Sequence, residues 1–493
     1  MRSGTIISLS LFWIVFTLVH TPAGAQMPVP KAIPDAYNFI RRDLNVFTNQ
    51  EEGLVHFYTQ LQLLEAGKRR KVNIVHIGDS HLQADFFSGT FRKLIHQHFG
   101  AAGRGLVFPF KVARTNSPAD IKAFSNTTWE VKRNVSPSRP LPIGVSGITL
   151  RTTDPNFILQ LSLGKSPQNL DYTFNKVTIF NEKGPECYDF LLSDADEANV
   201  FVQVKNVHHQ YYTVQKGDFL GKIADEHGIT LSQLKRWNNL RGDIIFPNQK
   251  LIVSPPVEGE AQADINNFRD LARIDNSSFS PSPFSTTVRL DQARSSILLR
   301  GKKTADTQKR ATLFGIVLEN DRQSGILYHM IGVNGAMFRH YNAAPDFFPQ
   351  VRELHPDLII ISLGTNESSG TSFNESWFYK NVNRMISLLE EHAPNADILL
   401  MTPSDAYRYR KYKNPNAGKA KEVLLAYAQE HHLAAWDFYE VMGGYGAISE
   451  WYNHGLAQRD RLHLTKRGYE LQGKLLYEAM MNGYREFLAR GSK

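Results

Sequence analysis

Strands and helices alternate in two separate stretches of this chain, and the separation constrains the fold more than any other feature. The first stretch joins the apolar run VNIVHI (72–77) through a polar turn to the helical segment FFSGTFRKLIHQHFG (86–100). The second begins after Arg322 and repeats strand, helix, strand, helix towards the C-terminus. Such alternation predicts a parallel, doubly wound sheet. We therefore expect one α/β domain that an insertion interrupts.

The sequence between these stretches has a different character. From about 111 to 320, short β-branched segments such as FILQLSL and ATLFGIVLE are separated by Gly, Pro, Asn and Ser. This pattern predicts a β-sandwich. Insertions of this kind are tolerated at surface loops. The α/β domain is therefore expected to consist of 26–110 and 321–493, with the sandwich at 111–320.

Inside the insertion lies a further compact unit, YYTVQKGDFLGKIADEHGITLSQLKRWNNLRGDIIFPNQKLIV, with the order strand, helix, helix, strand. It resembles a LysM module along essentially its whole length, at 211–254. The resemblance implies binding of peptidoglycan or another N-acetylglucosamine-containing glycan. Phe219 and Phe246 have a second interpretation as core residues. The implied binding residues are Gly217, Asp218, Phe219, Ile244, Ile245, Phe246 and Pro247.

The N-terminal segment MRSGTIISLSLFWIVFTLVHTPAGAQ combines an early arginine, an apolar stretch and small residues ending in Ala23-Gly24-Ala25. This order predicts a secretory signal over 1–25 that is cleaved before Gln26. We expect export across the inner membrane to a periplasmic or wall-associated location. No later run approaches the ~20 apolar residues of a membrane helix, so we expect no stable membrane insertion.

Composition narrows the chemistry further. Cys187 is the single cysteine, so the chain has no internal disulfide and no thiolate zinc site. Two pairs of adjacent histidines, at 208–209 and 431–432, have no third ligand at the spacing of a zinc site. We therefore expect no metal and no cofactor.

The net charge of +8 is spread along the chain. The densest basic stretch, YRYRKYK (407–413), interleaves tyrosines with cations, and we interpret it as a solvated surface segment. Export argues against a nucleic acid as partner.

The stretch HIGDSHLQAD places Ser80 directly after the first apolar strand. A serine attacks a carbonyl only if a base takes its proton and donors hold the oxyanion. Asp460 and His463, in RDRLHLTKRGY, form the only Asp-x-x-His of the chain. One loop can then deliver His463 to the serine and place Asp460 behind the ring. Each motif alone also fits an ordinary turn or a helix cap, but their joint occurrence favours catalysis.

Oxyanion donors are expected at the same edge of the sheet. Gly335 in IGVNGAMF and Asn366 in SLGTNESSG each follow a predicted strand, and reacting groups collect at the carboxyl ends of such strands. The backbone N–H groups of Ser80 and Gly335 and the side-chain amide of Asn366 are the three candidate donors. The stretch GVSG (144–147) mimics the glycine block, but it lies in the insertion, so we prefer Gly335.

Taken in order, GDSH, Gly335, Asn366 and the Asp460/His463 pair resemble the SGNH (GDSL) hydrolase superfamily. GDSHLQADFFSG, AAGRGLVFPF and YHMIGVNGA are similar to peptidoglycan O-acetylesterases that carry an inserted carbohydrate-binding-like β module. The resemblance implies a metal-independent serine esterase that removes O-acetyl groups from peptidoglycan through an acetyl-serine intermediate. GTNE replaces the more usual Gly-x-Asn-Asp, which leaves the role of Glu367 open.

The sequence also allows three alternative functions. The site also fits an acyltransferase, or an esterase for another acetylated glycan or lipid. A non-catalytic peptidoglycan-binding scaffold is the third possibility, although intact Ser80, Asp460 and His463 count against it. We interpret His81, beside Ser80, as structural or substrate-facing rather than as the base.

Overall fold

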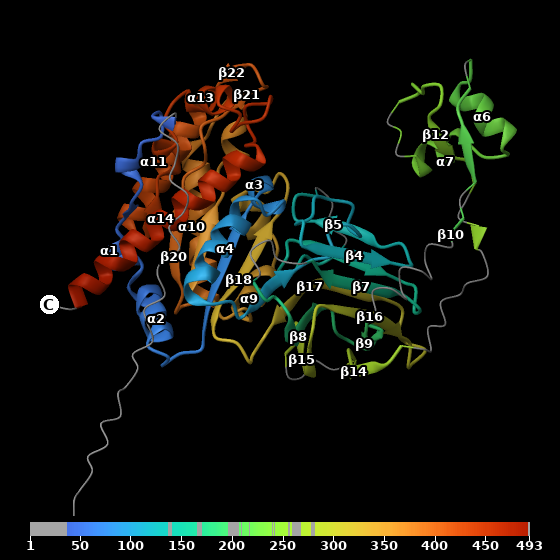
Figure 1. The fold of residues 1–493 in the computed structure, drawn as a ribbon, viewed down its shortest axis with the longest axis horizontal. Helices are drawn as coiled ribbons and strands as arrows, with labels where there is room; N and C mark the ends of the chain where they lie inside the picture. The colour runs from blue at the N-terminus through green and yellow to red at the C-terminus, as the bar shows by residue number, and fades with distance from the viewer. Residues whose placement is uncertain are drawn as a thin grey trace, which may run out of the picture.

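The computed structural model describes most of the chain between residues 37 and 491 (Figure 1). Its gaps are 137–140, 165–169, 196–206, 209, 216, 239, 241, 255–256, 259–267 and 278–281. The predicted signal segment and the strand-like run NVFVQVK (199–205) lie outside the described residues.

The α/β domain is built on a six-stranded sheet with the strand order β1-β23-β20-β19-β2-β18. All neighbouring strands are parallel except the edge pair β1 and β23. This confirms the predicted parallel, doubly wound sheet. The strands are β1 (Phe47–Thr48), β2 (Lys71–Gly78), β18 (Gly325–Gly332), β19 (Leu358–Ser362), β20 (Asp397–Met401) and β23 (Ala434–Trp436).

Two groups of helices cover this sheet. In the first group α2 (Val55–Glu65), α4 (Phe87–Phe99) and α14 (Lys466–Gly491) contact one another. In the second, α10 contacts its neighbours on both sides along the chain; its members are α8 (Phe338–Asn342), α9 (Phe347–Arg352), α10 (Glu375–His392) and α11 (Pro415–Glu430). The central strands are accordingly buried, which explains their nearly continuous apolar sequence. The short helices are η2 (Arg42–Leu44), α1 (Gln50–Gly53), α3 (Ser80–Gln83), η4 (Glu367–Ser369), α12 (Phe438–Val441) and α13 (Ala447–Asn453).

The insertion forms two antiparallel sheets, as the sequence predicts for a β-sandwich. One has the order β14-β9-β16-β7-β4 and the other β15-β8-β17-β6-β5, with β3 pairing β17 as well. The first consists of β4 (Ile121–Ser125), β7 (Ile158–Leu163), β9 (Asp189–Asp194), β14 (Asp270–Ile274) and β16 (Ser296–Lys302). The second consists of β5 (Glu130–Arg133), β6 (Ile148–Thr152), β8 (Phe174–Asn181), β15 (Ser285–Arg294) and β17 (Ala311–Glu319), and β3 (Gly103–Val107), which precedes the insertion in the sequence, extends it.

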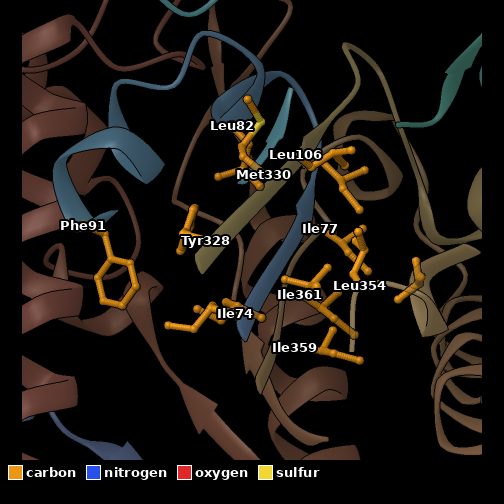
Figure 2. Close-up of a cluster of buried hydrophobic side chains, with 14 of the residues drawn as sticks. Ile74, Ile77, Leu82, Phe91, Leu106, Tyr328, Met330, Leu354, Ile359 and Ile361 are labelled. Carbon is orange, nitrogen blue, oxygen red and sulfur yellow. The ribbon is translucent and has the colours of Figure 1, made fainter. Parts of the chain in front are cut away.

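Strand β3 joins the sandwich to the α/β domain, because it pairs with β17 and also packs on β18. The approach is very close at Gly105, whose φ is +80° and whose Cβ, if present, would lie 2.0 Å from the carbonyl oxygen of Tyr328. Only glycine fits there. Figure 2 shows Leu106 near Met330 of β18 and on the same side as Ile77 of β2. The two parts therefore share one apolar core.

A buried ion cluster strengthens the same junction. Asp85, seven residues after the end of β2, accepts hydrogen bonds from Arg92 of α4 at 2.7 Å and from Arg104 of β3 at 2.8 Å. Arg104 also contacts Asp120 of the insertion at 2.6 Å. Both arginines are buried, and the carboxylates are the partners that such charges require. The serine turn is thus tied to the insertion.

The LysM-like unit has the predicted order of strand, helix, helix and strand: β11 (Tyr211–Thr213), α6 (Leu220–Glu226), α7 (Leu231–Trp237) and β12 (Lys250–Ile252). Strands β11 and β12 are antiparallel. A small core of its own, including Ile223, Leu234 and Leu251, holds the unit together. Strands β10 (Val207–His208) and β13 (Val257–Glu258) pair where the chain enters and leaves it.

Candidate active site

Three strands of the α/β sheet end at the same level, and each is followed by a predicted site residue. Gly78, at the end of β2, is opposite Gly332 of β18 on one side and Ser362 of β19 on the other. Ser80 follows β2 and lies first in α3. Gly335 and Asn366 follow β18 and β19 within a few residues. The register therefore brings all three turns to one edge of the sheet.

His463 connects the serine to the acid. Its Nε2 lies 3.1 Å from the hydroxyl oxygen of Ser80, and its Nδ1 lies 2.8 Å from Oδ2 of Asp460. This is the geometry that a serine nucleophile, its base and the acid that orients the base require. The side chains are partly open to solvent, with 31% of His463 and 23% of Asp460 exposed. A substrate can therefore reach the hydroxyl.

The loop that carries the pair is folded by its own hydrogen bonds. Oδ1 of Asp460 accepts the backbone N–H groups of Leu462 and His463, both at 3.0 Å. The N–H of Gln458 donates to the carbonyl of His463 at 2.8 Å and closes the loop just before α14. Burial disfavours the charged form of Asp460, but the hydrogen bonds from the His463 ring and from these N–H groups outweigh it and lower its pKa.

The candidate oxyanion donors differ in whether their N–H groups already have a hydrogen-bond acceptor. Among the described residues, the N–H groups of Ser80 and Gly335 have no acceptor. The amide of Asn366, in contrast, donates to Oδ2 of Asp79 at 3.0 Å and to the carbonyl of Ala336 at 2.9 Å. These bonds hold the serine turn, the Gly335 turn and the Asn366 turn together. To contact an oxyanion, the Asn366 amide has to share one of its two N–H groups.

Two buried carboxyl groups, those of Asp79 and Glu367, accept hydrogen bonds from the turns that carry the candidate oxyanion donors. Asp79 accepts the N–H of His81 at 3.0 Å, and Glu367 accepts the N–H of Phe338 at 2.7 Å. Burial raises the pKa of Asp79 to about 7, despite that hydrogen bond and the nearby His463. Burial likewise raises the pKa of Glu367 to about 7, despite its hydrogen bond and with Asp79 adding to the shift. The hydrogen bond from Phe338 to Glu367 thus stabilises the turn that carries Gly335.

His81 packs against the loop that carries Asp460 and His463. Its ring stacks on His463, and its Nδ1 lies 3.0 Å from the hydroxyl of Tyr469 in α14. Burial, together with the neighbouring His463, lowers the pKa of His81 to about 3. A ring that stays neutral and points at Tyr469 has the features of a structural residue.

Sequence inspection missed Gln83, which lies in α3 three residues after Ser80. Its Oε1 accepts the N–H of Asn334 at 2.8 Å, and its Nε2 donates to Asn116 of the insertion at 3.1 Å. It therefore fixes the turn that carries Gly335 and connects it to the insertion. No sequence signal marks it, because each contact comes from a distant part of the chain.

The other motifs have different surroundings. The GVSG stretch packs against the α/β domain: the Val145 N–H donates to Gln350 of α9 at 2.9 Å, and a Cβ added to Gly147 would lie 2.7 Å from Val333, two residues before Gly335. His431 stacks on Tyr427, and His432 contacts Glu52 at 2.8 Å. In the described parts of the chain, no three His, Cys, Asp or Glu residues are grouped as a metal site. Nor is any described helix both long and apolar enough to cross a bilayer.

The candidate LysM loops divide into exposed and structural residues. Phe219 and Phe246 are 63% and 67% exposed, and Ile244 is 77% exposed, so the interpretation of these phenylalanines as core residues does not fit. Ile245 packs on the small core. Asp218 accepts hydrogen bonds from Tyr212, Gln215 and Lys222, which order the first loop.

The comparison with known families agrees with both units. Residues 308–471 match the GDSL-like Lipase/Acylhydrolase family, and residues 212–254 match the LysM domain. The chain carries an SGNH (GDSL) hydrolase domain. The matched part of this hydrolase domain contains Gly335, Asn366, Asp460 and His463, while Ser80 precedes the insertion and lies outside the match.

The hydrolase fold and its insertion also occur together in a solved structure. A peptidoglycan O-acetylesterase superposes with a TM-score of 0.61 at 16% identity, covering 87% of this chain and 96% of that one. At this identity the likeness concerns the fold of the SGNH hydrolase and its insertion.

Two curated relatives match short stretches of the chain, close to the LysM domain in length. The autolysin of Enterococcus faecalis is 49% identical over 49 residues, and the cell wall-binding protein YocH of Bacillus subtilis is 44% identical over 52 residues. Each match covers 10% of this chain, and 7% and 17% of those proteins. The chain thus spans less than a fifth of their length.

Proposed function

We propose that this protein is an exported serine esterase that removes O-acetyl groups from peptidoglycan. The observation that carries the proposal is the chain of contacts from Ser80 Oγ through His463 to Asp460, at 3.1 and 2.8 Å. In this proposal, 26–110 and 321–493 form the hydrolase domain, 111–320 the insertion, and 211–254 a LysM domain that binds the wall.

The reaction proceeds in two steps. His463 Nε2 takes the proton of Ser80, whose oxygen bonds to the acetyl carbonyl carbon. The N–H groups of Ser80 and Gly335, and the Asn366 amide, hold the resulting oxyanion. As the tetrahedral intermediate collapses, the bond from acetyl carbon to sugar oxygen breaks, and His463 gives its proton to that oxygen.

Water completes the cycle. His463, again neutral, takes a proton from a water molecule, whose oxygen attacks the acetyl group on Ser80. The bond to Ser80 then breaks, acetate leaves and the serine regains its proton. Throughout, Asp460 holds Nδ1 of the imidazole protonated and stabilises the positive ring.

The substrate is inferred from what accompanies the site. The chain carries a LysM domain, short stretches of it are similar to an autolysin and to a cell wall-binding protein, and the fold with its insertion is similar to that of a peptidoglycan O-acetylesterase. A wall-bound LysM domain raises the effective concentration of substrate, to about the mM range for a short linker. The predicted signal over 1–25 would deliver the enzyme to the periplasm, where that substrate lies.

Acetate release tests the proposal. Purified enzyme is incubated near neutral pH with O-acetylated peptidoglycan and with the same material after chemical de-O-acetylation. We expect acetate from the first only, and none with Ser80→Ala. Absence of acetate with wild-type enzyme contradicts the proposed substrate, and transfer of acetyl to a sugar instead of water identifies an acyltransferase.

A further inference from the structure

The basic segment YRYRKYK lies against the catalytic loop, although nothing in the mechanism uses it. It forms the hairpin of β21 (Tyr407–Arg408) and β22 (Tyr412–Lys413). The N–H of Tyr407 donates to the carbonyl of Arg461 at 2.7 Å, and Arg461 stands between Asp460 and His463 in the sequence. Its guanidinium lies 4.9 Å from the ring centre of Tyr407. The hairpin is therefore held at the site.

Three cations of this region form no ion pair with a described carboxylate. Arg410, Lys411 and Arg459 are exposed, and no carboxylate of the described residues forms an ion pair with any of the three. The arginines at the domain junction, in contrast, each form ion pairs with Asp85 and Asp120. Clustered unpaired cations create a positive potential that attracts anionic groups.

Exposed tyrosines accompany these cations. Tyr409 is 68% exposed and Tyr412 is 54% exposed on the hairpin, while Tyr445 and Tyr452 are exposed nearby. Lys413 lies 5.3 Å from the ring centre of Tyr445, and Arg461 lies 5.0 Å from that of Tyr452. Such rings present an apolar face and a polar hydroxyl, a combination suited to a polar polymer at a wet surface.

A hollow connects the hairpin to the triad. It has a volume of about 680 Å³ and is lined by Arg410, Gln458, Arg459 and the catalytic acid Asp460. A chain bound in it would thus lie beside the loop that presents His463. The hollow reaches the triad at Asp460, so one substrate strand can contact both the cations and the site.

We infer that the surface formed by Tyr409, Arg410, Lys411, Tyr412 and Arg459, here called the basic strip, binds carboxylates of the peptidoglycan strand next to the acetylated sugar. The inference rests on the proposed function and deepens it. Muramic acid carries a lactyl carboxyl group, which is either free or extended by a stem peptide with carboxylates of its own. The strip gives the enzyme a preference for anionic strands over neutral acetyl esters.

Neutralising the strip tests this. The variant Arg410→Gln/Lys411→Gln/Arg459→Gln is compared with Lys68→Gln/Arg70→Gln/Arg322→Gln, a matched set of exposed cations just before β2 and β18, at the opposite edge of the sheet. Four substrates are used: acetylated strands with stem peptides, strands stripped of peptides, a neutral O-acetylated N-acetylglucosamine oligomer, and a small neutral acetyl ester.

We expect the ratio of kcat/KM on strands to kcat/KM on the small ester to fall about ten-fold in the strip variant, and to stay within about two-fold in the matched control. Added salt should lower the wild-type ratio towards that of the strip variant. A loss confined to peptide-bearing strands identifies peptide carboxylates, and a loss confined to stripped strands identifies the lactyl group. Either result supports the strip.

Two results overturn the inference while leaving the proposed function intact: an unchanged ratio in the strip variant, or an equal loss on the neutral oligomer. If wild-type enzyme hydrolyses the small ester but releases no acetate from either kind of strand, the proposed function is wrong and the inference falls with it.

Discussion

The imidazole of His81 stacks on that of His463, with ring centres 5.3 Å apart and an interplanar angle of 29°. Both histidines are thus close to Ser80, but only His463 contacts its hydroxyl and an acid. Burial lowers the pKa of His81 to about 3, so this ring is neutral wherever His463 works. His81 therefore supports the base as a flat, uncharged surface.

Replacing His81 by phenylalanine preserves a flat, neutral ring and removes the contact with the Tyr469 hydroxyl. Because one hydrogen bond is worth about 1 kcal/mol, we expect His81→Phe to retain activity within about ten-fold of wild type. His463→Phe should lose about 10⁴-fold or more. Steady-state hydrolysis of a small acetyl ester measures both. Equal losses in the two variants would show that His81 takes part in proton transfer.

The variant Asp460→Asn should separate the role of Asp460 in orienting the His463 ring from its role in folding the loop. An Asn oxygen can still accept the N–H groups of Leu462 and His463, but its NH₂ group then faces Nδ1 of the imidazole. The ring is driven to the tautomer that carries its proton on Nε2 and cannot accept the proton of Ser80. We expect kcat to fall about 10³–10⁴-fold with little change in Tm. An active Asp460→Asn enzyme would mean that another group orients the base.

Gly335 is a candidate oxyanion donor in the left-handed region, with φ at +79° and no described atom within 4 Å of an added Cβ. We expect Gly335→Ala to cost about 1–2 kcal/mol of stability. The strained backbone also shifts the N–H group of this candidate oxyanion donor, so kcat/KM should fall about 10²-fold. Gly67→Ala is the matched control, because Gly67 has φ at +66° and equally open surroundings. A similar loss of activity in both variants would remove Gly335 from the site.

Glu367 makes stability depend on pH in a definite direction. Burial raises its pKa to about 7 in the folded protein, above the ordinary value of 4.5, so folding favours the protonated form. That stabilisation is complete below about pH 4.5 and is lost as the pH rises through about 7. Between about pH 5 and about pH 8, wild type should lose about 1–3 kcal/mol more than Glu367→Gln. Denaturant unfolding at both pH values measures it, and parallel losses would place Glu367 in a more polar environment.

The parts of the fold that the sequence predicts are those with a strong local signal. The apolar runs of β2, β18 and β19 are buried on both faces, and the LysM order follows from two helices between two strands. Strands such as β9 and β14 were not expected. Their segments mix polar and apolar residues, and they become strands by pairing with each other across a long stretch of chain.

In the candidate site, too, some features could be predicted from the sequence and others could not. The polar turns after the strands mark Ser80, Gly335 and Asn366, since a parallel register brings strand ends together. The sequence contains no sign that the Asn366 amide is bound to Asp79, because the direction of a side chain depends on distant partners. The position of YRYRKYK beside Asp460 was equally hidden, as a local pattern of charges does not specify what it packs against.

The central claim is that Ser80 forms an acetyl ester during turnover, and rapid acid quenching followed by peptide mass spectrometry tests it most directly. Enzyme is mixed with a saturating activated acetyl ester, so that acylation outpaces attack by water. The account predicts one acetyl group, on the peptide that contains Ser80, and none in Ser80→Ala. Turnover without an acetylated Ser80, or an acetyl group on another residue that Ser80→Ala retains, would contradict it.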